Sequence, residues 1–186
     1  SNIVAHMRRR FLLETGKRAL CGIHGKELVG QNYKKVREHY PRANTGIFSA
    51  SLNRKDKRCE VTFANVQSIW RVAHEFRNVG LLMIDEAHLL PHTDEGMYRA
   101  LIAGLRRINP TLKIVGLTAT PWRLNSGNLC EPYGEQQPLF TEVAYEVPIT
   151  ELLKRGYLCP MIAKRTAQKL NVDGVHKRGG EFIEKE

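Results

Sequence analysis

Two short hydrophobic runs, each followed by polar side chains, constrain the fold of this chain most strongly. Leu81–Ile84 contains only apolar residues, and two carboxylates follow it directly. Continuous hydrophobicity is typical of a strand that is covered on both faces of a parallel sheet. Lys113–Leu117 reads as a second strand, and hydroxyl side chains come after it. Ligands of open parallel sheets bind outside the carboxyl ends of the strands, so the sequence predicts a polar site there.

The side chains after these runs suit a metal-bound phosphate. Mg²⁺ is usually held by one or two carboxylates together with substrate phosphates, and we expect Asp85 to hold it, directly or through water. Glu86 is placed to orient and deprotonate a water that attacks the γ-phosphate. His88 follows Asp85 by three residues, so a turn can bring it beside Thr118 or Thr120, where it would relay a conformational signal. The alternative is an acidic turn followed by a surface histidine.

Strands and helices alternate along most of the chain. The pattern predicts strands at 19–23, 45–49, 61–64, 81–84 and 113–117, and helices at 26–39, 66–74 and 95–108. This alternation predicts an α/β domain with a mostly parallel sheet flanked by helices. After Pro121 the pattern is weaker. It predicts a strand over 140–147, a short helix over 148–155 and a further strand over 157–164.

The same residues carry a family resemblance. Residues 85–88 (DEAH) resemble motif II, or Walker B, of superfamily 2 helicases, and Thr118 to Thr120 resembles their motif III. Upstream, Gly22 to Gln31 is similar to motif Ia, and Val61 to Ser68 is similar to motif Ib. The segment at 116–124 is most similar to the bacterial and phage DEAH-type branch that includes RadD-like proteins.

The resemblance implies a RecA-like lobe of the P-loop NTPase type, which is the first lobe of a nucleic-acid-dependent ATPase. The full-length protein would then be a helicase or translocase that uses ATP and Mg²⁺. Residues 1–146 would form the ATP-binding lobe. Residues 147–186 would form a helix, a strand and a connection toward a second RecA-like lobe.

The phosphate loop of this family, G-x-x-x-x-G-K-[ST], does not occur in the chain. Ser1 precedes a predicted helix that fits the one after this loop, so we expect Ser1 to be the last residue of a Walker A motif. The alternative is a tag remnant or an ordinary serine N-cap. Because a phosphate loop and an opposing lobe supply most contacts to the nucleotide, we expect these 186 residues alone to bind ATP weakly or not at all, and not to hydrolyse it.

The motif Ia and Ib segments predict contacts to nucleic acid. Backbone N–H groups at a helix N-terminus bind phosphate well, and His24 and Lys26 stand at such a position. Motif Ib adds a second group of expected contacts, which consists of Asn65, Gln67, Ser68 and Arg71. Contacts of this kind follow the backbone and imply little sequence preference. The alternative is that Gln67 and Ser68 only cap a helix. The basic loop at 53–58 is either a strand-contacting element or a solvated turn.

Composition fits these expectations. The chain has 29 Lys and Arg against 19 Asp and Glu, a net charge of +10, which favours an anionic partner, most simply nucleic acid. With the family resemblance, we expect DNA more than RNA. The alternative is a solvated basic surface. The four cysteines are widely separated and form no C-x-x-C pair, so a zinc ribbon or disulfide framework is not expected. A reducing cytoplasmic location fits, and the sequence shows neither a membrane span nor a signal peptide.

Two other functions use the same features. One is a non-catalytic nucleic-acid-binding module that keeps the fold without turnover. The other is the motor part of a restriction-type enzyme. The presence of Asp85 and Glu86 favours the ATPase over the non-catalytic module, because a module without turnover is free to lose them.

Overall fold

The computed structural model describes residues 2–90, 96–123, 127–132, 134–135, 137–160, 177–178 and 181–182. The chain forms two compact units, Ser1–Thr141 and Glu142–Glu186. The sheet and all the described site residues predicted from the sequence lie in the first unit. None of the helices in the described ranges has the length and apolar character needed to cross a membrane.

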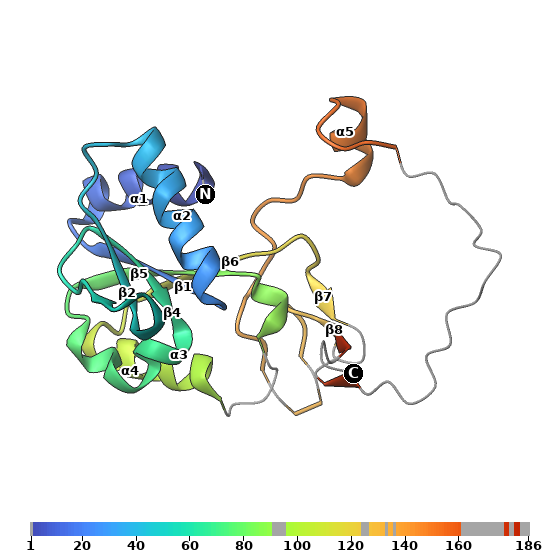
Figure 1. The fold of residues 1–186 in the computed structure, drawn as a ribbon. Coiled ribbons are helices and arrows are strands. Elements are labelled where there is room, and N and C mark those ends of the chain that lie inside the picture. Colours follow the sequence, from blue (N-terminus) through green and yellow to red (C-terminus); the bar gives the residue numbers. More distant parts are fainter. Residues whose placement is uncertain are drawn as a thin grey trace. The chain divides into compact units, whose positions relative to one another are not determined.

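A six-stranded sheet forms the centre of the first unit (Figure 1). Its strands are β1 Arg18–Ile23, β2 Thr45–Ser49, β3 Arg54–Lys55, β4 Val61–Asn65, β5 Val79–Asp85 and β6 Lys113–Leu117. The spatial order is β3-β2-β4-β1-β5-β6, and every neighbouring pair is parallel except β2 with β3. The carboxyl ends of the five parallel strands therefore share one edge of the sheet, called the carboxyl edge below. Their starts share the opposite, amino edge.

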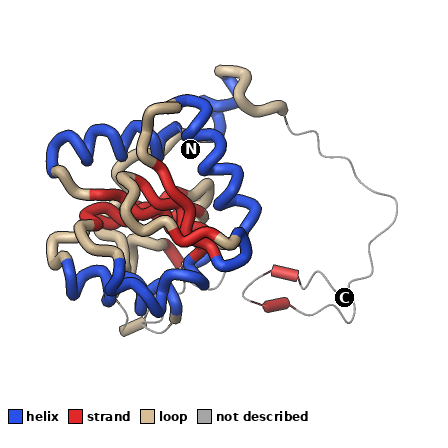
Figure 2. The backbone as a smooth tube through the Cα atoms, turned by 60° about the vertical axis from the view of Figure 1, so that its left-hand side comes forward, coloured by secondary structure: helices blue, strands red, loops and turns tan. Residues whose placement is uncertain are grey.

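Helices cover both faces of this sheet (Figure 1, Figure 2). One face carries α1 Asn2–Thr15 and α2 Lys26–His39. The other carries α3 Val66–Ile69, the 3-10 helix Trp70–Glu75 and α4 Met97–Ile108. Because helices cover both faces, the four strands β1, β2, β4 and β5 are buried at nearly every position, as expected for strands covered on both sides. β6 is only partly buried, and β3 is exposed.

Alternate side chains of each central strand enter two separate cores. Leu20 and Leu82 pack with the helices α3 and α4, whereas Cys21 and Met83 pack with α2. All four side chains are buried. This period of two is the ordinary pleat of a strand, and it lets one strand supply both cores.

Most of the elements expected in the first unit are confirmed. α2, β2 and β6 have the predicted bounds. The expected helix over 66–74 is an α-helix only to Ile69 and continues as the 3-10 helix Trp70–Glu75, which is kinked at Val72 (φ −111°, ψ 20°). The basic loop at 53–58 contains the short strand β3, which pairs antiparallel with the end of β2.

The predicted strand over 140–147 is wrong. These residues form neither strand nor helix, and the side chain of Tyr145 is 84% exposed. Alternating hydrophobicity does not make a strand unless a neighbour accepts its backbone hydrogen bonds, and no strand in the described residues pairs with this segment. The helix after it is confirmed as α5 Ile149–Lys154. Residues 157–160 contain no strand, and 161–164 lie outside the described residues, as does Ser1.

Two further antiparallel pairs are short. β7 Trp122–Arg123 pairs with β8 Gly127–Asn128 in the first unit, and β9 Lys177–Arg178 pairs with β10 Glu181–Phe182 in the second.

Candidate functional site

The polar residues singled out in the sequence follow four neighbouring strands at the carboxyl edge. Asp85 ends β5 and Thr118 follows β6, while Lys26 comes shortly after β1 and Asn65 ends β4. The order β4-β1-β5-β6 makes these strands consecutive. The fold therefore brings segments separated by up to about ninety residues in the chain to one edge, as expected for a parallel sheet.

Asp85 is held from two directions. The side-chain amide of Asn32, on α2, donates to Oδ2 of Asp85 at 3.2 Å, and the backbone N–H of Glu86 donates to Oδ1 at 3.2 Å. A carboxylate has about four acceptor positions, so Asp85 keeps acceptor capacity for water or a metal ion. Asn32 was not among the site residues predicted from the sequence. An amide at an inward position of an amphipathic helix is the signal that could have identified it as a site residue.

Glu86 stands at a strained turn. Its backbone is left-handed (φ 51°, ψ 51°), which is uncommon for a residue other than glycine. The turn ends β5 and starts the 3-10 helix Ala87–Leu89. The Glu86 side chain is 46% exposed, so its carboxylate can reach a ligand at the carboxyl edge. Such strain persists where the surrounding structure enforces it.

His88 and Thr118 are in hydrogen-bond contact across the ends of β5 and β6. His88 Nδ1 lies 2.9 Å from Thr118 Oγ1 and 3.3 Å from Glu86 Oε2. Thr118 Oγ1 donates to the carbonyl of Thr120 at 2.9 Å and accepts from the Thr120 N–H at 3.1 Å. Because a hydroxyl has one proton, these contacts are all satisfied when Nδ1 of His88 carries the ring proton. Thr120 takes part through its backbone.

Close packing of β6 against the 3-10 helix supports this contact. A Cβ atom at Gly116 would lie 2.8 Å from Cβ of Ala87 and 2.6 Å from Cζ of Phe140. Real Cβ atoms essentially never approach so closely, so the glycine allows β6 to lie against the segment that carries His88.

The charge of Asp85 reaches into the protein interior. Burial raises the pKa of the Cys21 thiol to about 12, and Asp85 adds to this shift. Burial also raises the pKa of Tyr98 to about 12, again with a contribution from Asp85. Asp85 thus borders a region of low dielectric constant, where charge interactions are stronger than in water.

The donor set at this edge suits a metal ion that is shared with a ligand. Within the described ranges, no group of three or more His, Cys, Asp or Glu side chains could enclose a metal ion. Asp85 and Glu86 are hard oxygen donors, and one or two carboxylates completed by phosphates and waters are the usual environment of Mg²⁺.

The motif Ib side chains are partly engaged within the fold. Asn65 Oδ1 accepts the N–H of Gln67 at 2.9 Å and caps α3, and Ser68 Oγ accepts the N–H of Ala50 at 3.1 Å. Gln67 and Arg71 are exposed and one helical turn apart. In motif Ia, His24 and Lys26 are exposed at the start of α2. The roles of these residues in binding stay predictions.

Comparisons with known proteins agree with this geometry. Residues 2–123 match the model of the family described as type III restriction enzyme, res subunit. The crystal structure of the UvsW helicase from bacteriophage T4 is similar to 64% of this chain, at 18% identity and a TM-score of 0.52. A second structure of T4 UvsW is similar to 63% of the chain, also at 18% identity and a TM-score of 0.52. No curated protein matches the chain.

These similarities have a defined extent. The chain covers 42% and 24% of the two UvsW structures, which is less than half of either. At 18% identity they show the fold, which is the RecA-like architecture that the sequence predicts. The family model covers all six strands of the sheet and both strand ends that carry the candidate site. The chain belongs to the type III restriction enzyme res-subunit family and forms a RecA-like lobe of the superfamily 2 helicase type.

Proposed function

We propose that the protein is an ATP-driven motor, a helicase or translocase stimulated by nucleic acid, and that this chain contains the catalytic edge of its first lobe. One observation carries the proposal. Glu86, His88 and Thr118 form one contacting group at the ends of two neighbouring strands, beside an Asp85 that Asn32 orients. This arrangement joins the two sequence motifs that resemble motifs II and III.

The residues take separate roles in this proposal. Asp85 holds Mg²⁺, which when bound neutralises charge on the transferred phosphoryl group. Glu86 is the general base that positions and deprotonates the attacking water. His88 and Thr118 relay the state of the nucleotide. Ser1, the expected last residue of a Walker A motif, lies outside the described residues, and its role stays a prediction.

Nucleic acid is the proposed partner at the other end of the carboxyl edge. Lys26 is exposed at the N-terminus of α2, where backbone N–H groups and a cation favour a phosphate. Gln67 and Arg71 present a second exposed pair at the start of the next helical segment. We propose that the bound nucleic acid is DNA and that a second RecA-like lobe closes the ATP site.

A restriction-type enzyme is the second candidate, because the family description names a restriction enzyme subunit. Its motor would use the same residues, so the two candidates differ in what the motor drives. ATP-dependent cleavage of duplex DNA by the intact protein would favour the restriction-type reading, whereas strand displacement without cleavage would favour the helicase.

The test is the substitution Glu86→Gln in the intact protein, with ATP hydrolysis measured with and without single-stranded DNA. Loss of a general base typically costs about 10²–10⁴-fold in rate, and the metal ligand Asp85 is left in place. Glu38→Gln is the matched control, because Glu38 is exposed on α2. Turnover by Glu86→Gln near the rate of an active parent would refute the proposal. Absence of turnover in the parent itself would also refute it and would favour the non-catalytic module.

A further inference from the structure

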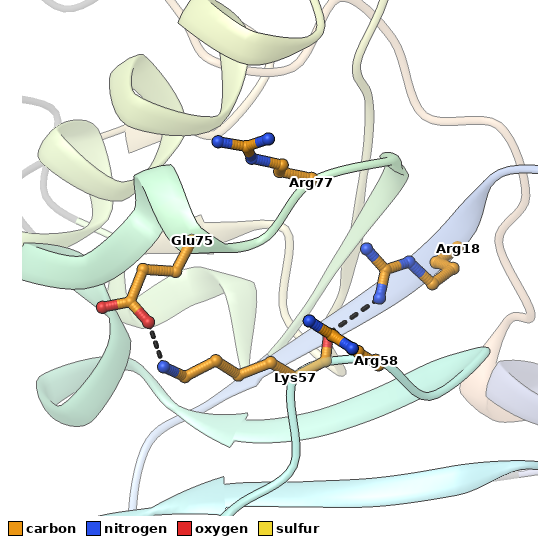
Figure 3. A pocket seen from close by; sticks show the side chains of 5 residues that line it. All are labelled: Arg18, Lys57, Arg58, Glu75 and Arg77. Carbon is orange, nitrogen blue, oxygen red and sulfur yellow. Dashed lines mark hydrogen bonds and ion pairs between the residues drawn. The ribbon is translucent and has the colours of Figure 1, made fainter.

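A charged pocket lies at the amino edge of the sheet, opposite the candidate site. Its volume is about 350 Å³, and its lining residues are Arg18, Lys57, Arg58, Glu75 and Arg77 (Figure 3). The four cations come from the starts of three neighbouring strands. Arg18 begins β1, Lys57 and Arg58 precede β4, and Arg77 precedes β5. The two edges of a parallel sheet are separated by the length of its strands, so this pocket is distinct from the site around Asp85.

Most of the positive charge in the pocket is not neutralised by the protein. Lys57 forms an ion pair with Glu75, and Arg18 donates to the backbone carbonyl of Lys57 at 2.8 Å. Figure 3 shows Lys57 reaching toward Glu75 and away from the Arg18 guanidinium. Across the described residues, no carboxylate forms an ion pair with Arg58 or Arg77. The lining therefore carries a net positive charge.

Two arginines of this pocket, Arg18 and Arg58, repel each other. Burial is the main cause that lowers the pKa of Arg18; the nearby Cys59 raises it in part, and the charge of Arg58 lowers it. A bound anion would relieve this repulsion. Guanidinium groups match phosphate and carboxylate oxygens in bidentate geometry, so the pocket suits an oxyanion.

The lining favours a phosphate backbone over a peptide or a nucleotide base. All five lining residues are charged, whereas protein partners anchor through aromatic and aliphatic side chains and small-molecule sites are mostly apolar. Neither kind of anchor is present in this lining. Contacts to nucleic-acid phosphates instead come largely from Arg and Lys and need no apolar surface.

Positive charge also continues along the amino edge beyond the pocket. Lys113, which is exposed, begins β6, next to the strand that follows Arg77. Arg106 and Arg107 are exposed in the last turn of α4. Neighbouring strands are about 4.8 Å apart, so cations at successive strand starts form a row rather than a single point charge. A row of cations fits a chain of phosphates better than one free anion.

We propose that the amino-edge pocket binds the phosphate backbone of a nucleic-acid strand, as a second contact surface separate from motifs Ia and Ib. The proposal shares with the proposed function the assumption that nucleic acid is the partner, and nothing else. Its contribution is electrostatic and does not depend on base sequence.

The experiment uses the intact protein carrying Arg58→Ala and Arg77→Ala together. Both side chains are exposed, and neither pairs with a carboxylate in the part of the chain that the structure describes. The fold should therefore tolerate their loss, and thermal unfolding checks this. Lys34→Ala with Lys35→Ala is the matched control, because these lysines are exposed on α2 and the change in net charge is the same. Binding of a labelled single-stranded oligonucleotide is measured by fluorescence anisotropy over a range of salt concentrations.

We expect the arginine variant to bind the oligonucleotide roughly tenfold more weakly than the lysine control at low salt. The slope of log K against log salt should become shallower by about 1.4, since each lost single-strand phosphate contact contributes about 0.7. Affinity and slope equal to those of the control would overturn the proposal. So would a variant that loses affinity for tripolyphosphate but keeps its affinity for the oligonucleotide, because the pocket would then serve a small anion.

Three further measurements separate this proposal from others. Displacement of the oligonucleotide by polyglutamate from the parent but not from the arginine variant would assign the pocket to an acidic protein and overturn the assignment to nucleic acid. ATP hydrolysis without nucleic acid should be equal in the arginine variant and the parent. Normal turnover in Glu86→Gln would refute the proposed motor chemistry and leave the amino-edge result standing.

Discussion

His88 and Thr118 contact each other across the ends of two neighbouring strands, with 2.9 Å between Nδ1 and Oγ1. His88 belongs to the segment that would sense the metal-bound phosphate, and Thr118 belongs to the segment that follows the next strand. A change in the position of Glu86 would reach Thr118 through this one imidazole, because the same nitrogen lies 3.3 Å from Glu86 Oε2. The contact is therefore the proposed route by which the state of the nucleotide controls movement along nucleic acid.

Thr118→Val should separate ATP hydrolysis from movement along nucleic acid. The substitution removes a hydroxyl that contacts His88 and the backbone of Thr120, and each such hydrogen bond contributes about 1 kcal/mol. We expect turnover to be largely kept and unwinding or translocation to be largely lost in the intact protein, with both measured on one preparation.

Thr120→Val is the control for that experiment. The hydrogen bonds between these threonines use the backbone of Thr120 and not its hydroxyl. This variant should therefore keep more coupling than Thr118→Val. An equal fall of both activities in Thr118→Val would instead assign its hydroxyl to the catalytic step or to folding.

Asn32→Ala should weaken the use of Mg²⁺. The Asn32 amide orients Asp85 Oδ2, and loss of a group that orients a metal ligand typically costs 10–100-fold in metal affinity or activity. We expect the Mg²⁺ concentration for half-maximal ATP hydrolysis to rise, with a smaller change at saturating Mg²⁺. Gln31→Ala, at an exposed position on the same helix, should leave the Mg²⁺ dependence unchanged. A rate loss that saturating Mg²⁺ does not reduce would argue against this role.

Features that depend on interactions between residues close in sequence can be predicted from the sequence, whereas contacts between residues distant in sequence mostly cannot. α2 and β6 are predictable because their side-chain periodicity and flanking residues are local. The meeting of His88 with Thr118 is also predictable, because both follow strands of one parallel sheet. The local pattern can mark Asn32 as an inward-facing amide of α2, but it does not identify Asp85 as the partner, since the packing of α2 on the sheet creates the contact across 53 residues.

The amino-edge pocket shows the same limit more clearly. Arg18 and Arg58 are 40 residues apart, Arg58 and Arg77 are 19 residues apart, and the three belong to no shared motif. Only the strand order β4-β1-β5 brings them together. The failed strand over 140–147 is the converse case, because its pattern was local and correct for a strand, but the described residues provide no pairing edge for it.

Alkaline pH should destabilise the protein through Cys21. Burial raises its pKa to about 12 from the ordinary value of 9.0, so the folded protein keeps the proton that the unfolded chain loses. The stabilisation is complete below pH 9 and is lost as pH rises toward 12, at about 1.36 kcal/mol per pH unit. Urea unfolding at pH 8 and pH 10 measures the loss. Cys21→Ala should show a smaller drop than the parent, whereas Cys159→Ala, at an exposed position, should match the parent. Equal drops in Cys21→Ala and the parent would exclude this thiol as the cause.

Gly116→Ala should disturb both stability and the His88–Thr118 contact. The added Cβ would lie 2.8 Å from Cβ of Ala87 and 2.6 Å from the Phe140 ring. The ring can rotate, but Ala87 is fully buried and its Cβ moves only with the 3-10 helix that carries His88. Overpacking of this kind typically costs about 1–3 kcal/mol, and we expect that loss in the free energy of unfolding together with reduced coupling of ATP hydrolysis to movement.

Gly30→Ala and a second-site change make this prediction specific. A Cβ at Gly30 meets nothing within 4 Å on α2, so this control should be stabilised by about 0.4–1 kcal/mol through reduced chain entropy. Ala87→Gly removes the atom that Gly116→Ala would strike, so the double variant should recover part of the lost stability and the coupling. Urea unfolding gives the stabilities, and paired ATPase and unwinding assays give the coupling. If the double variant is destabilised by the full sum of the two single changes, positions 87 and 116 do not interact. In that case, close packing of β6 against this turn is not what holds His88 beside Thr118.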